Sequence, residues 1–357
     1  MVGAMKARWN SIDCIKALAC IAVVFIHFNF PGWLGVAVKT FCRFGVPVFF
    51  ITSGFFFLQG GKMDDGKVAG KIRHILRLCI GAGLFYAWFT VAINHAASSS
   101  WSAGAFAVER LTADRIVKFF VTNDPFLYSH LWFLMGLLYC YLFALVLFGG
   151  NKRLNWIGMM MPVLLIAYSC LQEFGGALGI QRSLPIPGTD KRVYLFNLFL
   201  FRGMPFLLAG ILLYRHQNAV RRIPLGKVAA IGLGVVGGCI AIVERMYFEE
   251  SQFYVGTYLT LAAMMTYAIR HPEGGSRLLV HIGRDLSLYV YILHIAVGRV
   301  LDITAGKLEL RESGVYLYGR AVLVLLLSLL VAECIYQGKR RLSWSPTSAN
   351  GPEIHLD

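Results

Sequence analysis

Ten runs of predominantly apolar residues alternate along the chain with shorter polar and basic segments. Each run approaches the length of about 20 residues that an α-helix needs to cross the hydrocarbon core of a bilayer. The pattern therefore predicts an all-α polytopic membrane protein with about ten transmembrane helices. Their expected limits are 12–30, 36–58, 74–94, 130–149, 156–171, 194–214, 228–246, 252–270, 284–304 and 315–336.

The basic residues between these runs predict the orientation of the chain. With the N-terminus inside, nineteen Lys and Arg residues fall on the inner side and nine on the outer side, and the other six lie within the runs. Short cytoplasmic loops carry an excess of Lys and Arg, so we expect both termini to be cytoplasmic. The two longest polar segments, 95–129 and 172–193, then face outward, where they either shape an acceptor site or simply connect helices.

Composition supports the membrane class. The chain of 357 residues is 57% hydrophobic and only 15% charged, against about 25% charged in soluble domains. Its net charge of +15 is spread over short loops and no nucleic-acid motif occurs, so we expect attraction to membrane lipids and no nucleic-acid partner. The eight Cys residues form no CxxC pair, which argues against a zinc or redox site, and we expect no metal.

We expect one transmembrane domain over residues 1–340 and a polar, disordered cytoplasmic tail over 341–357. The first apolar run is too long for a signal-peptide core and lacks a small-residue cleavage site after it, so no cleavable signal is predicted. No convincing internal repeat is present, which is weak evidence against the inverted repeats of many transporters.

The first apolar run contains three ionisable residues that hydrocarbon should not tolerate: Asp13, Lys16 and His27. Asp13 and Lys16 are three residues apart and hence neighbours on a helix. Lys16 and His27 are separated by close to three helical turns, so they share one face at depths about 16 Å apart. Ionisable residues inside a membrane helix suggest a functional site by default, and these two positions suggest a reaction or pathway through the bilayer.

Five motifs in order resemble the membrane acyltransferase 3 family, and most closely its stand-alone surface-polysaccharide O-acetyltransferases. They are DCIKALACIAVVFIH from residue 13, GVPVFFITSGFFFL from 45, KIRHILRL from 71, HLWFL from 130 and SLYVYILH from 287. One departure is Lys16, where many members of the family carry Arg. Lysine lacks the planar fork of arginine, so we expect looser pairing with Asp13.

The resemblance implies a membrane O-acyltransferase of the bacterial cytoplasmic (inner) membrane. It implies transfer of an acyl group, most often acetyl, from cytoplasmic acyl-CoA to a hydroxyl of an extracytoplasmic or lipid-linked glycan. The motifs do not identify the glycan, nor do they separate acetyl from other acyl groups.

We assign the role of general base to His27, because histidine is the usual base near neutral pH and a sugar hydroxyl is a poor nucleophile while protonated. The Asp13–Lys16 pair then positions the cavity or contacts the donor. His130, Trp132 or a backbone N–H are candidates to stabilise the oxyanion. A covalent acyl intermediate on His27 or Ser53 is the less favoured route, because a thioester is already activated.

The remaining candidates concern substrate binding. Arg73 and Arg77 lie one helical step apart on the inner side, where they are placed to bind the phosphates of CoA. Ser53 and His294 complete a ladder of polar groups from the inner to the outer side. Tyr291 is a further substrate-binding candidate, for which packing is the favoured interpretation.

Each candidate also has a structural interpretation. Arg73 and Arg77 are then a positive-inside anchor, and Ser53 with Gly54 is a small-residue helix contact. His130 and Trp132 are then a pair in the interface belt, His27 is a structural histidine packed against a polar neighbour, and His294 is a satisfied core histidine. Arg202, Arg299 and Arg320 match no motif; Arg202 and Arg320 are secondary candidates for donor or acceptor contact. The competing function is a secondary transporter or flippase for a lipid-linked sugar, and a scaffold in glycan export is a third reading.

Overall fold

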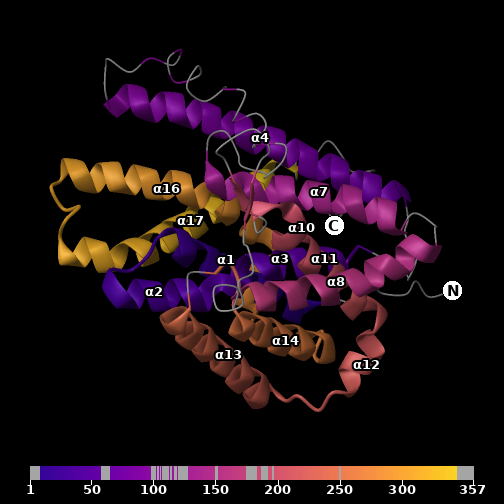
Figure 1. Cartoon of the computed structure of the whole chain (residues 1–357). Coiled ribbons are helices and arrows are strands. Elements are labelled where there is room, and N and C mark those ends of the chain that lie inside the picture. The colour runs from indigo at the N-terminus through magenta and orange to yellow at the C-terminus, as the bar shows by residue number, and fades with distance from the viewer. Residues whose placement is uncertain are drawn as a thin grey trace.

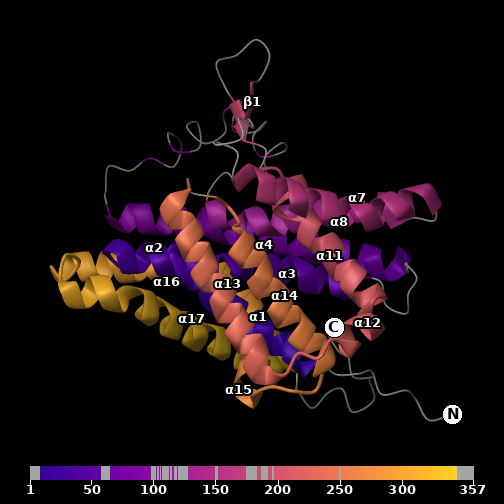
Figure 2. The same cartoon turned by 60° about the horizontal axis from the view of Figure 1, so that its bottom comes forward.

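The computed structural model describes most of the chain. The described residues are 9–57, 65–97, 102, 104, 106, 112, 115, 119, 128–148, 152–173, 183–185, 192–194, 197–248 and 251–343. In these ranges the protein is a bundle of helices with one small antiparallel hairpin (Figures 1 and 2).

The helices follow the apolar runs of the sequence. They are α1 (Asn10–His27), α2 (Gly32–Phe41), α3 (Gly45–Phe55), α4 (Asp65–Ala97), α7 (Trp132–Phe148), α8 (Lys152–Glu173), α10 (Phe199–Arg202), α11 (Met204–Arg215), α12 (Gln217–Arg222), α13 (Lys227–Tyr247), α14 (Val255–Arg270), α15 (Arg277–His281), α16 (Ser287–Lys307) and α17 (Gly314–Ser343). Short turns of other helical type complete them: η1 (Cys42–Phe44), η3 (Ser129–Leu131) and the π-helical η5 (Ile282–Leu286).

Seven helical segments in the described ranges are long and apolar enough to cross a membrane. They are Asn10–His27, Gly32–Phe55, Gly66–His95, Ser129–Phe148, Lys227–Tyr247, Arg277–Lys307 and Gly314–Leu342. The other three predicted runs correspond to α8, to α10 with α11, and to α14. The multi-pass class is thus confirmed, whereas the count of ten stays a prediction.

Three details differ from the sequence-based expectation. The run 194–214 is not one helix, because it breaks at Gly203 into α10 and α11. Strands β1 (Ser183–Pro185) and β2 (Arg192–Tyr194) pair within and beside the predicted outer segment 172–193, so the described part is not purely helical. Helix α17 continues to Ser343, so the first residues of the predicted tail are helical; residues 344–357 lie outside the described ranges.

Helix α1 lies at the centre of the bundle and packs against α3, α14, α16 and the η5 turn. Its packing faces carry small side chains, and Ala17, Ala19 and Ala22 are at most 2% exposed. Small residues let membrane helices approach closely. Because α1 is surrounded in this way, much of its surface contacts other helices.

The start of α1 and the end of α17 lie at the same end of the bundle. The side chain of Asn10 accepts a hydrogen bond from Arg284, just before α16, and Lys339 near the end of α17 donates one to Tyr289 at the start of α16. Helix α16 then runs about 30 Å to the opposite end, where the turn between Leu308 and Ser313 leads into α17.

Candidate functional site

Three histidines from distant parts of the sequence form a cluster near the end of α1. The ring centroid of His27 lies 6.2 Å from that of His130 and 5.2 Å from that of His294, and the rings of His130 and His294 lie 5.3 Å apart. His27 ends α1, His130 lies in η3 and His294 lies in α16. The sequence placed His27 and His130 at similar depth, and the structure brings them together.

The three rings differ in access and in hydrogen bonding. His27 is exposed, whereas His130 and His294 are 2% and 0% exposed. Nδ1 of His294 lies 3.0 Å from the carbonyl oxygen of Val290 and must donate to it, because a carbonyl only accepts. The Nε2 atoms of His130 and His294 are buried and have no hydrogen-bond partner among the described residues. Buried polar atoms without a partner are uncommon in proteins. His27 is thus the one member of the three whose side chain is exposed.

Two tyrosines fix the elements around the cluster. Tyr291 of α16 donates a hydrogen bond of 2.7 Å to the carbonyl oxygen of His130, and Tyr86 of α4 donates one of 2.6 Å to the carbonyl oxygen of Ile292. The Tyr86 ring also lies 5.0 Å from that of His130. Tyr291 therefore ties η3 to α16. Its hydroxyl holds the backbone of His130 in place, so the hydrogen bond of Tyr291 in this structure is to the protein itself.

A cation lies beside the same cluster. The guanidinium carbon of Arg202, at the end of α10, lies 3.5 Å from the ring centroid of Trp132. Trp132 is 8% exposed and follows His130 by two residues. Trp132, expected at the substrate, therefore contacts a cation that the sequence ranked only as a secondary candidate.

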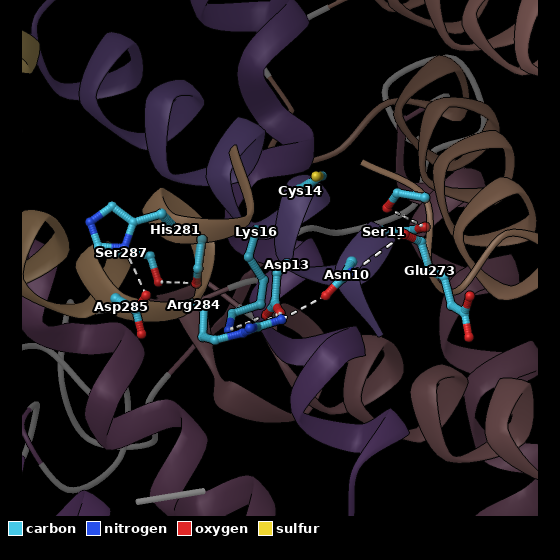
Figure 3. A network of polar contacts seen from close by, with 12 residues as sticks. Asn10, Ser11, Asp13, Cys14, Lys16, Glu273, His281, Arg284, Asp285 and Ser287 are labelled. Carbon is cyan, nitrogen blue, oxygen red and sulfur yellow. Dashed lines mark hydrogen bonds and ion pairs between the residues drawn. The ribbon is translucent and has the colours of Figure 1, made fainter. Parts of the chain in front are cut away.

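The other end of α1 carries an ionic network (Figure 3). Lys16 Nζ lies 3.3 Å from Asp13 Oδ1, so the expected pair is present. The other oxygen of Asp13 accepts a hydrogen bond of 2.9 Å from Nε of Arg284 and lies 2.7 Å from a terminal nitrogen of the same guanidinium. Arg284 also donates to Asn10 at 2.8 Å. The shorter contacts of Asp13 are therefore those with Arg284, which the sequence counted only among the basic residues of the inner side.

The π-helical turn explains how Arg284 reaches α1. Gly283 lies against the α1 backbone, and a β-carbon there would fall 1.8 Å from the carbonyl oxygen of Asp13. The widened turn and the missing side chain let this segment lie directly on α1. Single π-helical turns within helices are frequent at functional sites.

A second polar group lies on the other side of the η5 turn. His281 lies between two carboxylates, with Nδ1 2.8 Å from Asp285 and Nε2 2.7 Å from Glu333. These contacts tie α15 to α17, and the sequence gave no sign of them, because the partners are 52 residues apart.

The remaining candidates lie outside both groups. Ser53 is half-buried in α3. Arg73 and Arg77 are exposed on α4, which packs mainly against α7, and neither has a hydrogen-bond or ion-pair partner in the described part of the chain. The structure therefore does not join these arginines to Lys16. In the same described ranges, no group of three or more His, Cys, Asp or Glu is arranged to hold a metal ion.

Comparison with known families assigns the chain to a family. A family model described as an acyltransferase domain, acyltransferase 3, matches residues 9–336 and so covers nearly the whole chain. The chain belongs to the acyltransferase 3 family. No curated protein and no solved structure matches the chain. The resemblance seen in the five motifs is thereby confirmed.

Family membership and the apolar helices together make this protein a multi-pass membrane acyltransferase. The matched region contains both the histidine cluster and the Asp13 network. Three residues that contribute to these groups, Tyr86, Arg202 and Arg284, stood outside the motif-based site. Their common sequence signal was a polar or charged side chain in or beside an apolar run, which by itself does not reveal a partner.

Proposed function

We propose that this acyltransferase moves an acyl group, most simply acetyl, from cytoplasmic acyl-CoA to a hydroxyl of an extracytoplasmic or lipid-linked glycan. We also propose that it does so in the bacterial cytoplasmic membrane, with both termini cytoplasmic. The observation that carries the proposal is the position of His27: it is the exposed member of a histidine cluster, at the opposite end of α1 from the Lys16 network.

In the proposed reaction His27 is the general base. The acceptor hydroxyl oxygen attacks the thioester carbonyl carbon while its proton passes to a ring nitrogen of His27. The tetrahedral intermediate then collapses: the carbonyl re-forms, the carbon–sulfur bond breaks, and the CoA thiolate takes a proton from the imidazolium. No covalent acyl-enzyme is needed, because a thioester is already activated and holding donor and acceptor together supplies much of the rate.

The two ends of α1 suit the two ends of the donor. Lys16 and His27 are separated by about 16 Å along the helix, and the long pantetheine arm of CoA separates its phosphates from its thioester in a similar way. The proposal therefore places the phosphates near Lys16, with Arg73 and Arg77 as further cationic contacts for them at the same membrane surface. Ser53 and His294 line the path between, and His130 and Trp132 adjoin the reacting carbonyl.

The test is transfer by purified protein in liposomes, supplied with labelled acetyl-CoA and a surface glycan fraction. We expect release of CoA and label in the glycan. His27→Ala should lower the rate by about 10²-fold or more, the range for loss of a general base. His216→Ala, which removes an exposed histidine at the start of α12, is the matched control and should leave the rate unchanged.

Two outcomes would contradict the proposal at different points. Full activity of His27→Ala would remove His27 as the base but leave acyl transfer intact. Absence of CoA release, together with flux of a lipid-linked sugar driven by a pH gradient, would favour the transporter. Mass spectrometry of surface glycans with and without the gene identifies both the acyl group and the acceptor.

A further inference from the structure

An ion pair between α16 and α17, which lie side by side (Figures 1 and 2), takes no part in the motifs or in the proposed mechanism. A terminal nitrogen of Arg320 in α17 donates a hydrogen bond of 2.5 Å to Asp302 in α16. Tyr316, one helical turn before Arg320, donates a hydrogen bond of 2.6 Å to the other carboxylate oxygen. Both charged residues lie in segments long and apolar enough to cross a membrane. Ionisable residues in such segments are costly and by default suggest a site.

Arg320 lies on the buried face of α17. It shares this face with Tyr316, Val324 and Ser328, because these residues follow one another at four-residue steps. Tyr316 is 7% exposed, and Val324 and Ser328 are 0% exposed. The side chain of Arg320 nevertheless remains 30% exposed. The buried face of α17 is therefore open at Arg320, where a ligand can reach the guanidinium.

One face of α16 connects the ion pair to the histidine cluster. His294, Gly298 and Asp302 follow one another at four-residue steps and so share this face, with Asp302 about 12 Å from His294 along the axis. The Phe28 side chain, just after α1, lies on this face at Gly298, where a β-carbon would fall 2.1 Å from the ring. The centroid of the Phe28 ring lies 6.3 Å from that of His294 and 4.9 Å from the guanidinium carbon of Arg320. A single aromatic ring therefore separates Arg320 from the cluster.

The ion pair has unused hydrogen-bonding capacity. A guanidinium has several N–H donors and no acceptor, and Asp302 accepts a hydrogen bond from one of its nitrogens. Nε of Arg320 is buried and has no hydrogen-bond partner among the described residues, although buried polar atoms are usually paired. A carboxylate can accept several hydrogen bonds, and Tyr316 and Arg320 each give one to Asp302. The pair can therefore both donate to a ligand and accept from it.

Charge and position select the class of ligand. Arg320 and Asp302 have opposite charges 2.5 Å apart, so the pair as a whole is neutral and has no preference for an anionic group. Neighbouring donors and acceptors match sugar hydroxyls, because a hydroxyl both donates and accepts. Phe28 follows His27 directly in the chain. A glycan that presents one hydroxyl to His27 can therefore bring a neighbouring unit to Arg320.

We propose that Arg320 and Asp302 bind the hydroxyl groups of an uncharged sugar unit that neighbours the acylated unit of the acceptor glycan. This inference rests on the proposed acyl transfer and gives that reaction an acceptor subsite. Arg320 donates to the sugar oxygens, Asp302 accepts from the sugar hydroxyls, and Tyr316 holds Asp302 in place. No bond forms or breaks at the subsite, so it acts on acceptor binding and not on the chemical step.

The experiment is steady-state transfer by purified variants in liposomes, with labelled acetyl-CoA and a surface glycan fraction as acceptor. Arg320→Gln should raise the KM for the glycan by about 10- to 100-fold, the effect of losing one hydrogen bond from a charged group. The kcat at saturating glycan should change by less than about threefold, because the lost interaction is equal in the ground state and the transition state. The KM for acetyl-CoA should also stay within about threefold, since the donor binds elsewhere.

Arg311→Gln is the matched control, because Arg311 is an exposed arginine in the turn between α16 and α17. Its kcat and both KM values should stay at the wild-type values. Should Arg320→Gln lose its folded size-exclusion profile, Arg320→Lys decides. Lysine keeps the charge that pairs with Asp302 but lacks the planar fork, so we expect a folded protein whose glycan KM is raised about tenfold.

The salt dependence of the glycan KM tests the class of ligand. The ratio of this KM between Arg320→Gln and the wild type should stay constant within about twofold from about 0.05 M to 0.5 M salt, because salt screens charges and not neutral hydroxyls. A ratio that falls toward one at high salt would identify an anionic ligand and overturn the assignment to an uncharged sugar.

A wild-type glycan KM in folded Arg320→Gln or folded Arg320→Lys would overturn the inference. So would a lowered Tm and a lowered kcat with an unchanged glycan KM, which is the result expected if the ion pair only joins α16 to α17. Failure of the proposed function is separate and visible in the wild-type protein, which would then release no CoA at all and would exclude the subsite as well.

Discussion

The two carboxylate oxygens of Asp13 contact two different cations, and this arrangement bears on whether Lys16 can bind a ligand. Arg284 takes one oxygen at 2.7 and 2.9 Å, whereas Lys16 contacts the other at 3.3 Å. Charge-assisted hydrogen bonds are stronger when they are short, so Arg284 is the closer counter-ion of Asp13. The sequence placed Asp13 and Lys16 as mutual partners; tertiary contact adds Arg284 and leaves Lys16 available to a ligand.

Lys16→Met should therefore weaken donor binding more than it weakens folding. A hydrogen bond to a charged group contributes about 1.5–3 kcal/mol, so we expect the KM for acetyl-CoA to rise by about 10- to 100-fold. Lys16→Arg should keep the KM within about threefold, because the charge remains. Lys227→Met, at the exposed start of α13, is the control. An unchanged donor KM in Lys16→Met, measured by CoA release, would exclude this role.

At the scale of the element, the apolar runs predicted where helices form but not how they break. The run 194–214 divides at Gly203 because the chain there lies against Phe50 and Cys140 with no room for a side chain. The run 284–304 begins with a π-helical turn because Gly283 lies on the α1 backbone. Both breaks arise from close contacts between elements distant in sequence, so periodicity could not reveal them.

Close backbone approach also joins α3 to α11. A β-carbon at Gly210 would fall 2.0 Å from the carbonyl oxygen of Ile51. We expect Gly210→Ala to lower stability by about 1–3 kcal/mol through overpacking, because the backbone atoms that it meets cannot rotate away. The check is the apparent Tm in detergent by scanning fluorimetry.

Gly232→Ala is the matched substitution, because Gly232 is exposed on α13 with nothing within 4 Å of its β-carbon. Alanine there should leave the Tm unchanged or raise it slightly, since glycine inside a helix costs about 0.5–1 kcal/mol relative to alanine. Equal changes in Tm for Gly210→Ala and Gly232→Ala would contradict this prediction, because they would show that α3 and α11 move apart enough to accommodate the added methyl group.

At the scale of the whole molecule, charged contacts gather at the two ends of the bundle. The start of α1 and the start of α16 lie at one end. The end of α14 lies there too, because Ser11 donates a hydrogen bond to the carbonyl oxygen of His271. Helix α12 joins the same end, because Arg270 donates a hydrogen bond to the carbonyl oxygen of Arg221. The turn between α16 and α17 lies at the other end, where Asp302 pairs with Arg320 at 2.5 Å.

Labelling in intact cells tests which end is cytoplasmic. In a protein whose own Cys residues are replaced, Glu312→Cys should react with a membrane-impermeant maleimide from outside. Asn218→Cys, in the basic α12, should react only after permeabilisation, because basic loops stay inside. Reaction of both positions from the same side would contradict the two-ended arrangement, and the reverse pattern would place the termini outside.

The sequence by itself determined the class of protein, the places where helices form, and the residues Asp13, Lys16, His27, His130 and His294 as members of the candidate site. It could do so because apolar length, charge bias and motif spacing are local properties of the chain. Only the tertiary structure decided that three histidines meet, that Asp13 pairs chiefly with Arg284 and that Arg202 lies on Trp132. Those partners are brought together by packing between helices far apart in sequence, which no local pattern encodes.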